Sequence, residues 1–392
     1  MLTAVQRYFT KQKFSTRCNI LVIVFSRKGM NYKQRKSVRW LVLILLVVAI
    51  KVLSIKPSWV ETIYTYGVYP FIARVQRVLL GWVPFSIGDI FYVLVLLSIF
   101  IICIKGLKAF YKRRISRSTF RRGVVRVIFF WALIFVAFYG LWGLNYSRQG
   151  IASQLNLEEK KYAYNDLDTL VHLLHTRLNH HASQITPAIR DSFKSKRNLF
   201  KSAPQMYTIA EKQYPFLKYK NYSVKPSLFS YIGNYFGFQG YYNPFTGEAQ
   251  VNTTIPLCLE PFVTAHEIAH QLGYAKESEA NFVGFLACRL HPSEHFKYSV
   301  YFEMFQYAIK ELHYVDSVRA QSYLQTLHPL VQKDIRECRE FYQKYSNPIE
   351  PYIAEAYSYF LKANNQPKGK ASYNEVVMWL IAYYKRYGTT AI

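Results

Sequence analysis

The stretch HEIAHQLGYAKESEANF, residues His266 to Phe282, predicts a metal-binding helix. Side chains four positions apart lie on one face of a helix, about one turn from each other, so His266 and His270 can direct their imidazoles at a single metal ion. Glu267 follows the first histidine, where a carboxylate can hold a metal-bound water molecule and accept its proton. A catalytic zinc ion (Zn²⁺) needs a third protein ligand and one position open for water, so a third ligand is expected nearby.

The residues after the second histidine favour a carboxylate as this third ligand. In metzincin peptidases a histidine follows the glycine of HExxHxxG by three positions, and here Lys276 stands three positions after Gly273. A protonated ammonium group cannot bind zinc, so the likeness to metzincins ends at this residue. A turn at Gly273 and Tyr274 is expected to end the first helix, and a second helix is expected from about Lys276 through Leu290.

Two glutamates begin this second helix. Glu277 shares a helix face with Asn281 and Gly284, so Asn281 can hydrogen-bond a metal ligand while the small Gly284 lets the two helices approach closely. Glu279 points away from that face and has no such companions. We therefore predict Glu277 as the third ligand with Asn281 behind it, and keep Glu279 as the alternative.

A known signature matches this arrangement. The E-x-x-A-N pattern that starts at Glu277 resembles the second half of the gluzincin signature, E-x-x-A-[DN], which occurs in HtpX-like and CAAX-prenyl endopeptidases and in ImmA/IrrE-type peptidases. In those families the first glutamate of the pattern is the third zinc ligand, so the resemblance implies that role for Glu277. The segment from His270 to Glu277 is shorter than in most of these families, which again leaves Glu279 as an alternative.

Positive charge is concentrated beside apolar segments. Residues 1–39 hold ten Lys or Arg and no Asp or Glu, and residues 105–122 hold eight more, again without an acidic residue. From residue 145 to the end, the chain has 27 basic and 21 acidic residues. Membrane proteins distribute charge in this way, so the formal net charge of +27 does not indicate a nucleic-acid partner.

Three apolar segments are predicted to cross a membrane: Trp40–Ile55, Ile87–Ile104 and Val124–Leu144. The first is marginal because Lys51 interrupts it. The loop Lys56–Ser86 between the first two spans has few charges and several aromatic residues, as segments at a membrane interface do.

The distribution of Lys and Arg also predicts the orientation. Loops rich in these residues stay in the cytoplasm, so the N-terminus and the loop before the third span are expected there, and everything after Leu144 outside it. Translation can also begin at Met30, which would leave a short basic lead before the first span. The predicted organisation is a basic cytoplasmic N-terminus (1–39), a three-span region (40–144) and an extracytoplasmic domain (145–392).

From about Met30 to its end, the chain resembles a domain-of-unknown-function family of bacterial membrane proteins, in which three N-terminal spans precede an extracytoplasmic HExxH domain. The likeness is carried by the HEIAH stretch and by PFSIGDIFY (Pro84–Tyr92), LWGLNY (Leu141–Tyr146) and GYYNPFTGEAQVN (Gly240–Asn252). It implies a multi-pass protein of the bacterial inner membrane whose C-terminal domain is periplasmic.

A β-hairpin is predicted just before the metal-binding helix. The turn-forming sequence NPFTG (Asn243–Gly247) separates two arms, Gln239–Tyr242 and Ala249–Thr253. An edge strand at this place can hold an extended peptide by backbone pairing, and it can equally be a structural cover over the core.

Other candidate groups are less specific. A helix predicted to start at Asn165 or Asp166 carries four histidines, His172, His175, His180 and His181. We interpret this tract as a solvated helix end rather than a metal site. The five cysteines include no CxxC pair and predict neither a disulfide framework nor a cysteine metal site. One disulfide stays open among Cys258, Cys288 and Cys338.

The chain after the motif is predicted to be helical, over Tyr298–Tyr314, Asp316–Leu327, Pro329–Tyr345, Pro348–Ala363 and Tyr373–Tyr387. A group that stabilises an oxyanion is expected near the metal. The candidates, which the sequence does not rank, are Tyr373, His291, His295 and Arg289.

Together these features predict an α-helical membrane anchor of three transmembrane helices and a mainly α, α+β zincin-like domain with a small β-hairpin before the metal-binding helix. The expected function is zinc-dependent hydrolysis of peptide bonds outside the cytoplasm, with Glu267 as general base and a peptide or protein as substrate. The alternative is a non-catalytic zinc-binding envelope scaffold or partner-binding protein. A sensor that cleaves itself or a neighbour ranks last.

Overall fold

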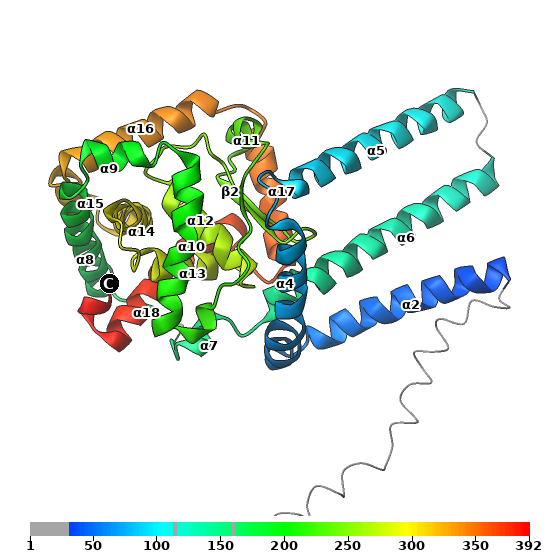
Figure 1. Ribbon diagram of the computed structural model, residues 1–392, viewed down its shortest axis with the longest axis horizontal. Helices are drawn as coiled ribbons and strands as arrows, with labels where there is room; N and C mark the ends of the chain where they lie inside the picture. Colours follow the sequence, from blue (N-terminus) through cyan, green and yellow to red (C-terminus); the bar gives the residue numbers. More distant parts are fainter. Residues whose placement is uncertain (1–30, 113–115, 159–160) are drawn as a thin grey trace, which may run out of the picture.

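The computed structural model describes residues 31–112, 116–158 and 161–392. Most of the predicted basic N-terminus, including the alternative start at Met30, lies outside the described residues. The described chain is mostly helical with one three-stranded sheet, and three long helices project from one side of a globular body (Figure 1).

Two of the long helices, α5 (Ile87–Tyr111) and α6 (Arg117–Leu141), are long and apolar enough to cross a membrane, with mean hydropathies of 2.7 and 2.3. They contain most of the second and third predicted spans. The third long helix, α2 (Tyr32–Leu53), meets the criterion only together with the helical segment Pro57–Leu80, which it joins at a bend of 110°. The described residues thus hold two candidate spans, or three if this bent pair counts as one.

The segment between α2 and α5 is helical, so the loop expected over Lys56–Ser86 is wrong. It consists of α3 (Pro57–Trp59), the π-helix η1 (Val60–Val68) and α4 (Tyr69–Leu80). The sequence obscures η1 because the β-branched and aromatic residues that fill it have low helix propensity. Val60 and Tyr64 of η1 are buried in a core that includes residues of the body.

The sheet has the strand order β1-β3-β2. β2 (Gly240–Asn243) and β3 (Glu248–Val251) form the predicted antiparallel hairpin, and Gly247 in its turn has a φ of 70°, which favours glycine. β1 (Val224–Pro226) pairs in parallel with β3 and is an addition to the prediction, since three residues are too short to show an alternating pattern. β2 therefore lies at one edge of the sheet.

The body is built around α12 (Glu260–Gln271) and α13 (Glu277–Cys288), in which every residue is buried. The helices predicted after the motif are confirmed to within a few residues, except that the last one begins as a 3-10 turn. Other helices of the body are α7 (Ile151–Gln154), α8 (Tyr164–Ser183), α9 (Pro187–Ser192), α10 (Lys196–Gln213), α11 (Ser230–Phe236), α14 (Glu294–Val315), α15 (Ser317–Gln325), α16 (Pro329–Tyr345), α17 (Glu350–Ala363) and α18 (Val376–Tyr387). The 3-10 turns are η2 (Gly143–Ser147), η3 (Pro215–Leu217), η4 (Gly369–Glu375) and η5 (Thr389–Ala391).

A second, smaller core joins the long helices to the body. It contains Tyr69 from α4, Trp142 from the end of α6, and Tyr242 and Ala275 from the body. Asn145, the first residue of the predicted extracytoplasmic domain, is completely buried. Residues 40–144 and 145–392 therefore share a core and do not pack as separate units.

Candidate metal centre

The connection between α12 and α13 depends on glycine. Gly273 adopts a φ of 86°, which residues with a Cβ rarely adopt, and this lets the chain turn between His270 and Glu277. Where the two helices cross, a Cβ on Gly284 would lie 3.3 Å from the backbone nitrogen of His266. The close approach of the helices and the turn at Gly273 follow the prediction.

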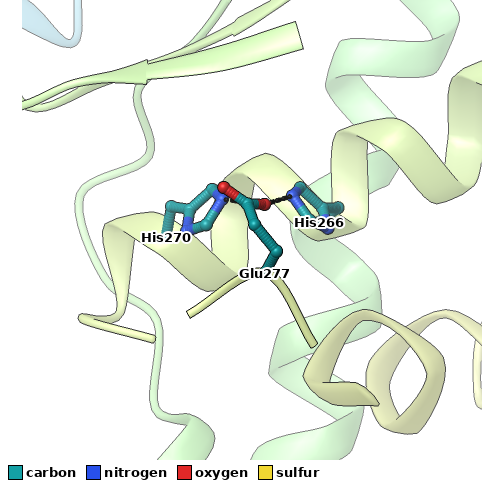
Figure 2. A group of neighbouring side chains, drawn as sticks. All are labelled: His266, His270 and Glu277. Atoms are coloured by element: carbon teal, nitrogen blue, oxygen red, sulfur yellow. Dashed lines mark hydrogen bonds and ion pairs between the residues drawn. The ribbon is translucent and has the colours of Figure 1, made fainter. Parts of the chain in front are cut away.

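This packing brings His266, His270 and Glu277 together (Figure 2). One candidate ligand atom from each residue lies within 4.8 Å of the others. Glu277 Oε2 is 3.1 Å from His266 Nε2 and 3.4 Å from His270 Nε2. Two imidazole nitrogens and a carboxylate oxygen form a donor set that suits zinc, so the residues present fit a divalent metal ion.

The charge state of Glu277 also suits a cation. Burial by itself would raise the pKa of this carboxyl, but the neighbouring His270 and His266 outweigh burial and hold the pKa well below its usual range. Glu277 is 3% exposed. The centre therefore presents an ionised carboxylate, which is the form that binds metal.

Each histidine is oriented through its second ring nitrogen. His266 Nδ1 lies 2.7 Å from Asn281 Oδ1, and His270 Nδ1 lies 2.7 Å from the backbone carbonyl oxygen of Tyr274. When Nδ1 donates to these oxygens, Nε2 carries the free lone pair and faces Glu277. Asn281 thus occupies the supporting position expected of it.

Glu267 is 4% exposed and lies close enough to His270 and Glu277 for their charges to affect its pKa. Its Oε2 has no hydrogen-bond partner among the described residues, and burial raises its pKa to about 8. A Cβ on Gly240 would lie 2.7 Å from Glu267 Oε1, so the edge strand β2 passes directly over this carboxylate. A buried carboxyl oxygen without a partner is costly, so Glu267 Oε2 is open to a ligand.

Glu279, the alternative third ligand, points elsewhere. Its Oε1 is 3.3 Å from Lys276 Nζ, and a Cβ on Gly150 would collide with its carboxylate. The group of candidate metal ligands found in the described residues contains Glu277 and not Glu279.

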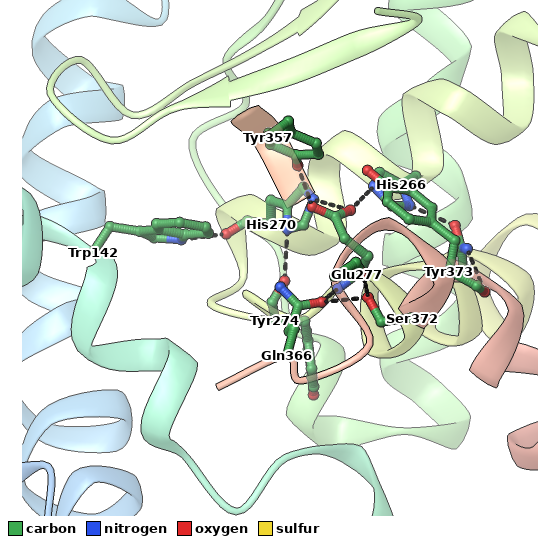
Figure 3. A network of polar contacts seen from close by, with 11 residues as sticks. Trp142, His266, His270, Tyr274, Glu277, Tyr357, Gln366, Ser372 and Tyr373 are labelled. Carbon is green, nitrogen blue, oxygen red and sulfur yellow. Dashed lines mark hydrogen bonds and ion pairs between the residues drawn. The ribbon is translucent and has the colours of Figure 1, made fainter. Parts of the chain in front are cut away.

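Two tyrosines from the C-terminal helices cover the centre (Figure 3). The hydroxyl of Tyr357 donates to Glu277 Oε1 over 2.7 Å, and the ring of Tyr373 stacks on His266 with centroids 6.2 Å apart. Tyr373 was one of four predicted candidates near the metal. The sequence does not single out Tyr357, because it is one of 34 tyrosines and lies 80 residues from its partner.

The three other oxyanion candidates lie away from the centre. His291 stacks on Phe296, and Arg289 donates to the hydroxyl of Tyr214. His295 is fully buried against Phe193. These residues follow the motif closely in the sequence. They lie beyond the C-terminal end of α13, however, while Glu277 lies at its first residue.

The segments before residue 150 hold the loop that follows His270. Trp142 Nε1 donates to the backbone carbonyl oxygen of His270 over 2.8 Å, as Figure 3 shows. The Tyr69 hydroxyl donates to the backbone carbonyl oxygen of Gln271 over 2.7 Å. Arg148 donates to the carbonyl oxygen of Gly273 and forms a buried ion pair with Glu61 at 2.8 Å. The sequence predicts none of these contacts.

Two further predictions concern histidine and cysteine. His181 pairs with Glu294 at 2.6 Å and is 8% exposed, so the interpretation of the tract as a solvated helix end is wrong at this residue. Its partner lies 113 residues away, so local spacing does not predict it.

The sulfur atoms of Cys258 and Cys338 lie 3.7 Å apart as free thiols.

The fold and the site define a mostly helical protein with helices long enough to cross a membrane and a buried centre of two histidines and a glutamate. The chain belongs to the family described as Protein of unknown function (DUF3810), whose model matches residues 64–381. That match begins inside η1, so the family includes the segment that contacts the loop after His270. No curated protein and no solved structure matches the chain.

Proposed function

We propose that this protein is a membrane-anchored, zinc-dependent peptidase that hydrolyses peptide bonds outside the cytoplasm. The observation that carries the proposal is Glu267, a buried carboxyl group with an unpartnered oxygen, within electrostatic reach of His270 and Glu277, which converge with His266. A centre that only stabilises the fold has no use for such a group and is usually closed by a fourth protein ligand.

The three donors would hold the zinc ion, which when bound polarises a scissile carbonyl and lowers the pKa of the attacking water. Glu267, whose ionised form a bound cation would favour, would accept the proton of that water and pass it to the leaving amine. The strand β2 lies at the sheet edge above Glu267, where its backbone can pair with an extended peptide. The hydroxyl of Tyr357 donates to Glu277 Oε1, so it would hold this ligand carboxylate in position.

A second candidate function is a non-catalytic zinc-binding scaffold. It is favoured by the burial of the centre, in which His266, His270 and Glu277 are each no more than 7% exposed, and by the Tyr357 hydroxyl on Glu277. On this alternative, zinc would stabilise the contact of α17 with the helix pair.

The test compares the full-length parent with Glu267→Gln and, as a matched buried control, Glu279→Gln. Zinc is quantified by mass spectrometry, and cleavage is followed on a broad peptide library. We expect equal zinc in all three proteins and loss of cleavage in Glu267→Gln alone. Equal zinc with no cleavage by any of them would favour the scaffold.

A further inference from the structure

Two helices of the body have large apolar side chains on their outer faces. On α17, Tyr352 is 74% exposed and Tyr359 is 64% exposed. Leu361 is the one residue of this fully described helix that is buried. On α11, Tyr231 is 60% exposed and Ile232 is 52% exposed. Such side chains are normally covered by a partner when they cluster.

Both helices are attached directly to the candidate membrane spans. Near the end of α17, the ring of Phe360 contacts that of Phe138 in α6, with centroids 6.1 Å apart, and Asn364 accepts a hydrogen bond from Tyr139 over 2.7 Å. Just before α11, the backbone nitrogen of Leu228 donates to Asp89 in the first turn of α5 over 2.7 Å. Figure 1 shows α17 on the side of the body from which α5 and α6 project.

These attachments determine the depth of the two helices. Phe138 lies one turn before the end of α6 at Leu141, so Phe360 lies level with the end of an apolar span. The polar headgroup layer that follows the hydrocarbon core is about 5 to 8 Å thick on each side. Tyr352 lies eight residues before Phe360, about 12 Å along the helix, so the direction of α17 matters. Figure 1 shows α17 crosswise to α5 and α6, so its length adds little to its distance from that layer.

We propose that the outer faces of α11 and α17 lie in the headgroup layer of the membrane that α5 and α6 cross. Their partner is then the lipid surface. Tyrosine suits this place because its ring is apolar and its hydroxyl remains hydrated. Lys362, which lies over the ring of Tyr359, adds a cation that suits lipid phosphates. The inference depends on the candidate spans and not on the proposed peptidase activity.

The experiment places a fluorescent label at single cysteines in the full chain. Cys18 and Cys103 are first replaced by serine, and cysteine is then introduced by Tyr352→Cys, Tyr231→Cys or the control Val318→Cys. Val318 is 80% exposed on α15, which lies across the body from the long helices in Figure 1. Each labelled protein is placed in nanodiscs of phosphatidylcholine and phosphatidylglycerol, with or without lipids that carry a nitroxide on the headgroup.

We expect nitroxide lipids to reduce the fluorescence at positions 352 and 231 about twofold and to leave position 318 unchanged, because the nitroxides are confined to the thin headgroup layer. Aqueous iodide should quench position 318 more than the other two. Strong iodide quenching at 352 and 231 without nitroxide quenching would overturn the proposal. Protection from both quenchers would also overturn it, since protein and not lipid would then cover the two helices. Equal elution volumes of the three variants show that they are folded alike.

Discussion

Trp142, the residue that follows α6, donates a hydrogen bond from its indole Nε1 to the backbone carbonyl oxygen of His270 over 2.8 Å. The indole also packs edge-on against the His270 ring, with centroids 5.9 Å apart. Trp142, at the end of a candidate membrane helix, thus contacts both the backbone and the ring of the candidate metal ligand His270. We infer that these contacts help to position His270.

Replacing Trp142 by phenylalanine should weaken zinc binding about fivefold. The change removes one buried hydrogen bond, worth about 1 kcal/mol, while a ring remains to fill the space. Zinc affinity is measured by competition with a chelator. The control is Trp131→Phe on the exposed surface of α6, which should bind zinc like the parent. Equal affinity in both variants would show that the contact does not position His270.

Glu277 and Glu279 should respond differently to the same substitution. Glu277→Gln removes a candidate ligand and should lower zinc affinity by more than about 100-fold, since even residues behind the ligands change it by about 10 to 100-fold. Glu279→Gln should retain the affinity of the parent because Glu279 points toward Lys276. The reverse result would identify Glu279 as the ligand.

Asn281→Ala should lower zinc affinity about tenfold, because the hydrogen bond that orients His266 would be lost. The same titration measures this effect. Asn281→Asp, which keeps an oxygen at the same place, should restore most of the affinity. If the alanine and aspartate variants bind zinc equally, the orienting role is wrong.

Acid should destabilise the protein through His295. Burial, and to a lesser degree the charge of Arg190, lower its pKa to about 4, with Asp334 and Lys196 as the other charged neighbours. The unfolded side chain titrates near 6.5, so the unfolded state binds more protons between these values, and stability is lost as the pH falls from about 6.5 to 4. The full shift corresponds to about 3 kcal/mol.

Acid unfolding followed by near-ultraviolet circular dichroism measures this dependence. Glutamine stays neutral and has a similar size, so His295→Gln should unfold at a lower pH than the parent, with a shallower loss of stability above pH 4. Identical midpoints for the two proteins would contradict the prediction.

Cys258 and Cys338 should form a disulfide under a mild thiol oxidant. Their sulfur atoms are 3.7 Å apart and belong to segments separated by 80 residues. A bridge that closes a loop of this length stabilises a protein by about 4 kcal/mol in the chain-entropy description. Mass spectrometry under non-reducing conditions detects the bond, and Cys258→Ser is the control. Absence of the bridge after oxidation would contradict the prediction.

Local patterns account for much of the centre. The spacing of His266, His270, Glu277 and Asn281 places these side chains within two neighbouring helices, where helical periodicity decides which ones share a face. The hairpin is equally local, because its turn residues lie between its two arms. Apolar length predicted α5 and α6 for the same reason.

Contacts between distant segments escape such patterns. Tyr69 and Gln271 are 202 residues apart, and Trp142 and His270 are 128 apart, so no periodicity links them. Tyr357 reaches Glu277 from a helix whose sequence predicts only its helicity. The π-helix η1 escapes prediction because its β-branched and aromatic residues have low helix propensity. The helix α4 has an amphipathic pattern with good helix formers, so the sequence does contain a local signal for it.

The smaller core shared by Tyr69, Trp142, Tyr242 and Ala275 has a consequence for modularity. Truncation at residue 145 would expose this core and remove the hydrogen bonds to the backbone of His270, Gln271 and Gly273. The residues after 145 are therefore not expected to keep the centre intact when they are expressed without the anchor. Extraction that disturbs η1 and α4 should loosen the same backbone. The amount of zinc retained after extraction would then indicate whether a detergent has preserved the structure of these helices.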